Sequence, residues 1–147
     1  MLLEAGAEEN LQDDDGCSPL HTAAGAGYAD VARGLLEAGA DTGLKDSNGF
    51  TALHRAASEG RVELLRLLLE AGASQDAQDD YDYTALHCAS VNNHIEAVRL
   101  LLQARADTEV QDEQRLTALQ RASQMGLIEI AHLLESHAAH AFASHVP

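Results

Sequence analysis

The pattern of apolar and polar positions is that of short amphipathic helices. Apolar side chains fall at Val62, Leu65, Leu68 and Leu69, and the same spacing recurs further along the chain. Apolar residues three and four positions apart lie on one face of a helix. No stretch shows the strict alternation of apolar and polar residues that is typical of a half-buried strand. The pattern therefore predicts an all-α protein.

The chain repeats itself every 33 residues. The tetrapeptide Ser-Pro-Leu-His at residues 18–21 has counterparts that begin at positions 51, 84 and 117. Each begins with a residue whose side-chain oxygen can cap a helix: Ser18, Thr51, Thr84 and Thr117. Nine residues later comes a column suited to a left-handed residue that ends the helix: Gly27, Gly60, Asn93 and Gly126. Each unit is predicted to contain two short helices and an exposed turn.

One helix pair cannot bury its apolar face alone, so the units are expected to stack as a solenoid with one continuous core. Small residues such as Ala56 and Ala89 allow the helices to approach closely. The predicted divisions are a remnant of a preceding repeat at 1–9, repeats at 13–45, 46–78, 79–111 and 112–138, and a partly disordered tail at 139–147.

The beginning of the chain falls inside the pattern. Met1 occupies the same column as Gly34, within the last turns of a second helix. We therefore hypothesise that the sequence is a segment or shortened isoform of a longer array. Its first unit is expected to fray or to be covered by self-association, since it lacks an N-terminal neighbour. Otherwise a monomer is expected.

The repeated box, the alanine pair that follows it, and the Leu-Leu-Glu-Ala-Gly-Ala segments at 35–40 and 68–73 resemble ankyrin repeats. The resemblance covers about residues 1 to 140 and implies a slightly curved stack of helix-turn-helix units with hairpin-like loops. It also implies a concave binding face formed by hairpin tips and first helices. In this family the histidine of the box bonds backbone groups of adjoining hairpins.

Some positions depart from the pattern. The hairpin glycine column continues as Asp82 and Arg115, and the glycine that follows the second helix is replaced by Arg105. An arginine with a left-handed backbone should cost about 1 kcal/mol unless the local turn differs. Drift in terminal repeats is the favoured explanation.

The composition constrains partners and compartment. The 9 basic and 24 acidic side chains give a net charge of −15, which argues against nucleic-acid binding. No apolar run approaches the roughly 20 residues of a membrane span. Cys17 and Cys88 lie two layers apart and are expected to be free thiols, with Cys17 the more accessible. We expect the cytoplasm, with the nucleus as the alternative.

Neither a cofactor nor a metal ion is expected, and no enzyme activity. Catalytic and phosphate-binding motifs are missing from the sequence. One column of carboxylates is interpreted as turn-forming residues: Asp13, Asp46, Asp79 and Asp112. The histidines of the box lie in consecutive layers and cannot converge on one ion: His21, His54 and His87. Near the end, His137 and His140 could share an ion or sense pH, but a solvated tail is the stronger interpretation.

Partner choice is expected where the repeats differ from one another. The tip column holds Cys17, Phe50, Tyr83 and Leu116, with Tyr81 close by. Polar tip positions are Asp14, Asp15, Ser47, Asn48, Asp80, Glu113 and Gln114. The first-helix side adds Glu59, Val91, Asn92 and Met125. Together these residues are expected to form an acidic groove with a row of apolar side chains along it. Such a groove predicts a protein partner that carries Lys or Arg beside apolar residues.

Three alternatives remain open at this stage. Phe50 and Tyr83 could simply pack against neighbouring hairpins, since exposed apolar residues are common. The array could instead be a regulatory part of a larger adaptor, receptor or enzyme that positions another domain. An enzyme of its own is a distant third possibility, which a closed cleft with converging ionisable groups would support.

Overall fold

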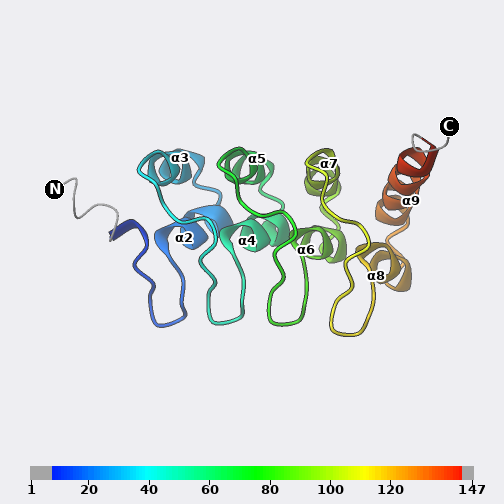
Figure 1. Cartoon of the computed structure of the whole chain (residues 1–147), viewed down its shortest axis with the longest axis horizontal. Helices are drawn as coiled ribbons and strands as arrows, with labels where there is room; N and C mark the ends of the chain where they lie inside the picture. The colour runs from blue at the N-terminus through cyan, green and yellow to red at the C-terminus, as the bar shows by residue number, and fades with distance from the viewer. Residues whose placement is uncertain (1–7, 144–147) are drawn as a thin grey trace.

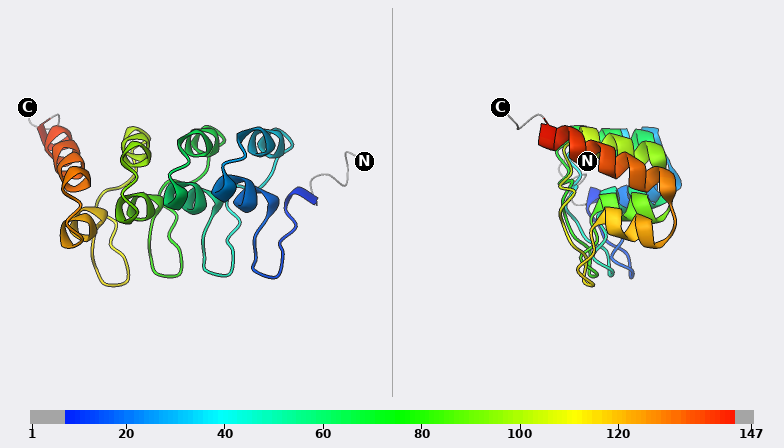
Figure 2. Two further views of the ribbon diagram at one scale, coloured as in Figure 1. Left: turned by 180° about the vertical axis from the view of Figure 1, so that it is seen from behind. Right: turned by 90° about the vertical axis from the view of Figure 1, so that its right-hand side faces the viewer.

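The computed structural model describes residues 8–143, and its helices form two rows (Figure 1). The row of first helices contains α2 (Pro19–Ala26), α4 (Ala52–Glu59), α6 (Ala85–Val91) and α8 (Ala118–Gln124). The row of second helices contains α3 (Ala29–Glu37), α5 (Val62–Glu70), α7 (Ile95–Gln103) and α9 (Ile128–Ala143). Viewed along the stack, the hairpins superpose and project away from the row of second helices (Figure 2). The predicted all-α solenoid is confirmed for these residues.

Each first helix begins with the predicted cap. The side chain of Thr51 accepts a hydrogen bond from the backbone N–H of His54, and the His54 ring accepts one from the N–H of Thr51. Ser18, Thr84 and Thr117 form the same reciprocal arrangement with the third helical residue. This capping box satisfies N–H groups that have no partner within the helix.

The left-handed columns are confirmed, including the positions where glycine is replaced. Asn93 ends the first helix of its repeat with φ 59°, where the other repeats have glycine. Arg105 and Arg115 adopt φ values of 64° and 66°, so the turns keep their geometry without glycine. The expected cost of about 1 kcal/mol for each arginine therefore applies.

The core is continuous through the stack and consists of leucine and alanine. Leu65, Leu68 and Leu101 are fully buried between the two rows of helices. Ala56 and Ala89 are also fully buried, where successive first helices pack together. Small alanine side chains allow neighbouring first helices to lie close together.

Backbone hydrogen bonds link one hairpin to the next. The N–H of Ser47 donates to the carbonyl oxygen of Asp15 (2.9 Å), and equivalent bonds connect the later hairpins. Nearby, Nζ of Lys45 donates to the carbonyl oxygen of Gln78 (3.0 Å). The hairpins thus form one ladder along the edge of the solenoid.

One predicted boundary needs correction. Helix α9 continues to Ala143, past the predicted end of the last repeat at 138, so residues 139–143 are helical rather than part of a tail. Apolar and helix-favouring residues continue beyond the repeat, which explains the extension. The rest of the predicted tail, 144–147, and most of the predicted remnant, 1–7, lie outside the described residues. Between positions 8 and 143, no helix has the length and apolar character to cross a bilayer.

Candidate functional site

Most of the predicted partner-binding residues are exposed on the hairpin side of the molecule. The exposed ones are Asp14, Asp15, Ser47, Asn48, Glu59, Asp80, Tyr81, Asn92, Glu113, Gln114 and Met125. The half-buried ones are Cys17, Phe50, Tyr83, Val91 and Leu116. The tip carboxylates give this side a negative charge, and the half-buried group adds apolar surface beneath it.

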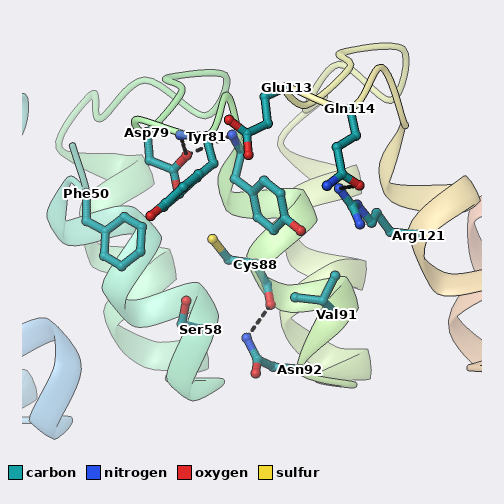
Figure 3. Close-up of a pocket in the computed structure, with 11 residues that line it drawn as sticks. Phe50, Ser58, Asp79, Tyr81, Cys88, Val91, Asn92, Glu113, Gln114 and Arg121 are labelled. Atoms are coloured by element: carbon teal, nitrogen blue, oxygen red, sulfur yellow. Dashed lines mark hydrogen bonds between the residues drawn. The ribbon is translucent and has the colours of Figure 1, made fainter. Parts of the chain in front are cut away.

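A pocket of about 380 Å³ lies between the hairpins and first helices of the second, third and fourth repeats. We call it the tip pocket (Figure 3). Its lining includes predicted residues, namely Phe50, Tyr81, Tyr83, Val91, Asn92, Glu113 and Gln114. It also includes four residues that the sequence analysis did not assign to the binding face: Ser58, Asp79, Cys88 and Arg121.

A neighbouring hollow of about 360 Å³ continues the surface toward the N-terminus and shares Phe50 and Ser58 with the tip pocket. It also contains Glu59, as predicted for the binding face. Several predicted residues line neither hollow: Asp14, Asp15, Cys17, Ser47, Asn48, Asp80, Leu116 and Met125. The structure thus brings part of the predicted set together, whereas Met125 lies at the end of α8 and the other residues lie on the hairpins.

The aromatic residues of the tips differ in exposure. Tyr81 is 54% exposed, as expected of a residue at an open tip. Phe50 and Tyr83 are half-buried, so both are less exposed than Tyr81. The Phe50 ring stacks on His54 with centroids 5.8 Å apart, and Tyr83 packs on His87 at 5.2 Å. These two rings therefore combine packing with exposure to the pocket.

The histidines of the repeated box have the structural role that the family resemblance implies. Nδ1 of His54 accepts from the N–H of Thr51 (3.1 Å), and Nε2 donates to the carbonyl oxygen of Tyr83 in the next hairpin (2.8 Å). His21 and His87 make equivalent contacts. An amide N–H only donates and a carbonyl only accepts, so the hydrogen is on Nε2.

Burial favours the neutral imidazole of His54 and His87. Burial lowers the pKa of His54 and His87 below the ordinary 6.5, although the hydrogen bond to the next hairpin opposes this shift. Both ring nitrogens are occupied by backbone groups, so the histidines are linkers between hairpins. In the described part of the chain, no cluster of three or more His, Cys, Asp or Glu side chains could hold a metal ion.

The turn-forming aspartates hold the hairpins in shape. Oδ1 of Asp46 accepts from the N–H groups of Asn48 (2.9 Å) and Phe50 (3.0 Å), and its Oδ2 binds Arg55 at 2.7 Å. Burial alone raises the pKa of Asp46, but the hydrogen bonds from Arg55 and the backbone outweigh it, so this pKa lies below its usual range. Asp112 makes the same bonds with its own hairpin and with Arg121, and its pKa is lowered for the same reasons.

The third repeat departs from this arrangement. Oδ1 of Asp79 accepts from the N–H groups of Tyr81 (2.8 Å) and Tyr83 (2.9 Å), but the position of the arginine is taken by Cys88. Cys88 is 4% exposed, and burial raises the pKa of its thiol to about 12. Cys17 is half-exposed, so the predicted ranking of the two thiols by accessibility is correct.

The replacement of arginine by cysteine in the third repeat is visible in the sequence. One column at the 33-residue period reads Thr22, Arg55, Cys88 and Arg121. The cysteine interrupts two arginines, and each arginine lies nine residues after a turn-forming aspartate. Only the packed structure shows that aspartate and arginine meet at this spacing.

Comparison with known proteins agrees with the architecture. The family model described as ankyrin repeats (three copies) matches residues 1–79 and 72–143. No curated protein matches the chain significantly. The family match covers most of the sequence, and the described residues show the capped helix pairs and stacked hairpins that the repeated motifs predict. The chain therefore belongs to the ankyrin repeat family.

Proposed function

We propose that this chain is a protein-protein interaction module that binds a partner segment across the hairpin tips and first helices. Ankyrin repeats in general serve this role. The observation that carries the proposal is the tip pocket, a concave surface of about 380 Å³ built from three consecutive repeats. It combines three aromatic rings with carboxylates, and aromatic residues are common anchors of protein interfaces.

The charge of this surface supports a basic partner segment. The chain has a net charge of −15, and carboxylates such as Asp80 and Glu113 are exposed on the tips. Opposite charge speeds association and selects among partners, and raised salt weakens it. A segment that carries Lys or Arg beside apolar residues fits both the acidic rim and the aromatic lining.

The proposal includes no catalytic step. The histidines of the repeated box use both ring nitrogens to link hairpins, and the buried aspartates hold turns through backbone N–H groups. These groups are therefore engaged in structure, and the proposal assigns them no general acid or base role. For the compartment we propose the cytoplasm or nucleus, where the thiols of Cys17 and Cys88 stay reduced.

Peptides selected from a random displayed library on the immobilised chain test this function. Tyr81→Ala removes an exposed aromatic ring of the tip pocket and leaves the stacked pairs at Phe50 and Tyr83 in place. We expect selected peptides to bind this variant about tenfold more weakly or worse, since aromatic anchors often contribute more than 1 kcal/mol. Titration calorimetry with each peptide measures the change.

Tyr28→Ala is the matched control, because Tyr28 is 58% exposed and lies at the turn between α2 and α3, away from the tip pocket. We expect its affinity for the selected peptides to equal that of the unmodified chain. Peptides whose binding depends on Tyr28 and is indifferent to Tyr81 would show that the hairpin face is not the interface.

A further inference from the structure

In the second and fourth repeats, an arginine of the first helix fills a slot beside the hairpin. The guanidinium of Arg55 lies 2.7 Å from Oδ2 of Asp46, and the side chain of Asp46 is only 1% exposed. Arg121 binds Oδ2 of Asp112, whose side chain is fully buried. In both repeats a buried carboxylate has one oxygen on the turn and the other on a guanidinium.

In the third repeat the same slot is open. Asp79 is 6% exposed, and its Oδ1 is engaged by the turn as in the other repeats. The residue in the position of the arginine is Cys88, and no arginine of residues 8–143 forms an ion pair with Asp79. Both residues line the tip pocket, and the sulfur of Cys88 points toward the space between the aromatic rings (Figure 3).

The repeat period shows what a guanidinium in this slot would contact. The Arg121 guanidinium lies 5.6 Å from the ring centroid of Tyr83, which belongs to the preceding hairpin. The Arg55 guanidinium lies 5.9 Å from the ring centroid of Phe50, which belongs to its own hairpin. If both contacts are transferred to the third repeat, a guanidinium above Cys88 lies near two rings. One is Phe50 on the preceding hairpin, and the other is Tyr83 on the hairpin of the third repeat itself. Each of the occupied slots has one such ring, whereas the open slot has two.

We propose that this slot binds an arginine side chain of a partner protein segment, with its guanidinium on Oδ2 of Asp79 between Phe50 and Tyr83. The inference rests on the proposed function and identifies the group of the partner that is recognised. A planar guanidinium stacks on aromatic rings and donates paired hydrogen bonds to a carboxylate, which an ammonium cannot do. Glu113 on the rim adds negative charge.

Titration of the isotope-labelled chain with N-acetyl-arginine methylamide, followed by amide NMR, tests the slot directly. We expect shifts centred on residues 79–91 and saturable binding. The citrulline analogue, which has the same shape without the charge, should bind about tenfold more weakly or worse. The lysine analogue should also bind more weakly than arginine. Equal binding of arginine and citrulline would overturn the proposal.

Two substitutions change the slot in opposite ways. Asp79→Asn keeps an oxygen for the N–H groups of Tyr81 and Tyr83 but removes the charge, so arginine binding should fall about tenfold or more. Cys88→Arg supplies the guanidinium from within the chain, so it should raise the melting temperature and abolish binding of the arginine compound. Tyr28→Ala, at an exposed position away from the tip pocket, is the control and should leave binding of the arginine compound unchanged. Unchanged binding to the Asp79→Asn variant would overturn the proposal even if the Cys88→Arg variant did not fold.

The library peptides separate this inference from the proposed function. Peptides that depend on Tyr81 should contain an arginine whose replacement by citrulline reproduces the effect of Asp79→Asn. If such peptides lack a required arginine, the slot inference is wrong and the proposed function stands. If the arginine compound binds through Asp79 while selected peptides are indifferent to Tyr81, the slot is real and the proposed hairpin interface is wrong.

Discussion

The second and third repeats share one backbone and differ in what lies beneath the hairpin tip. Both have a buried turn-forming aspartate and a histidine that links the hairpin to the next. In the second repeat Arg55 closes the space beside Asp46, whereas in the third Cys88 leaves the space beside Asp79 open. A single position in the repeat thus decides whether the hairpin base is closed by an ion pair or open as a pocket.

A repetitive framework can therefore acquire a distinct site through one changed position. The caps, left-handed turns and alanine contacts are the same in both repeats, so stacking is unaffected by the exchange of arginine for cysteine. Some positions of the repeat therefore determine the fold, and other positions determine which partner is bound. The comparison predicts that a closed repeat loses stability when it is opened.

The largest expected effect follows from opening the fourth repeat with Arg121→Ala. The substitution removes the partner of Oδ2 of Asp112, which is fully buried, and a hydrogen bond of 3.0 Å to Gln114. We expect the free energy of unfolding to fall by about 2 kcal/mol, the range for hydrogen bonds to charged groups. Urea denaturation at neutral pH measures the change.

The matched control is Arg99→Ala, because Arg99 pairs with Glu96 at 3.3 Å on the exposed face of α7. Its loss should change stability by no more than about 0.5 kcal/mol. The same loss in both variants would mean that the closed slot contributes no more than a surface ion pair.

The stability of the closed slot in the fourth repeat should also depend on pH. The pKa of Asp112 lies below its ordinary 3.8 in the folded chain, because hydrogen bonds from Arg121 and the backbone outweigh the opposing effect of burial. Its stabilising contribution is present above about pH 4 and is lost as the pH falls through the folded pKa. As the pH is lowered from about 5 to about 3, the free energy of unfolding should therefore fall less for the Arg121→Ala variant than for the unmodified chain.

A smaller effect is expected from His87→Gln, which places in the third repeat the residue that the fourth has at Gln120. The histidine donates to the carbonyl oxygen of Leu116 (3.0 Å), and the shorter glutamine should lose this bond. We expect a loss of about 1 kcal/mol at pH 7.5 by urea denaturation. The hydrogen bond of Gln120 to the Thr117 N–H (2.9 Å) shows that glutamine preserves the cap.

This loss should shrink in mild acid. Burial lowers the pKa of His87 below 6.5 in the folded chain, so the unfolded chain takes up a proton first as the pH falls. Below about pH 6.5 the unmodified chain therefore loses the stability that its neutral His87 contributes. The variant has no imidazole at this position, so its stability does not fall for this reason. His132→Gln makes the same exchange on the exposed face of α9 and serves as the control. A gap that widens toward pH 5 would contradict a neutral, buried His87.

The framework could be predicted from the sequence because it repeats. Thr51 and Thr84 recur at a fixed spacing, so their role as caps is seen more than once, and the same holds for the left-handed position at Gly60. Local chemistry determines each of these features, because cap and turn geometry depends on a few neighbouring residues.

The open slot could not be predicted, because it depends on contacts between repeats. Asp79 was recognised as a turn former and Cys88 as a free thiol, but their shared pocket depends on a missing side chain and on two rings from different hairpins. The half-buried state of Phe50 and Tyr83 likewise depends on stacking against histidines that local sequence does not reveal. Residues 139–143 were assigned to a partly disordered tail because the repeat pattern stops at 138, whereas α9 continues to Ala143.

A crystal structure of the chain bound to one of its selected peptides would show whether the slot holds an arginine of the partner. We expect a peptide that lies along the hairpins and first helices, with an arginine guanidinium within hydrogen-bond distance of Oδ2 of Asp79. A peptide bound to the row of second helices, with the space above Cys88 empty, would contradict it.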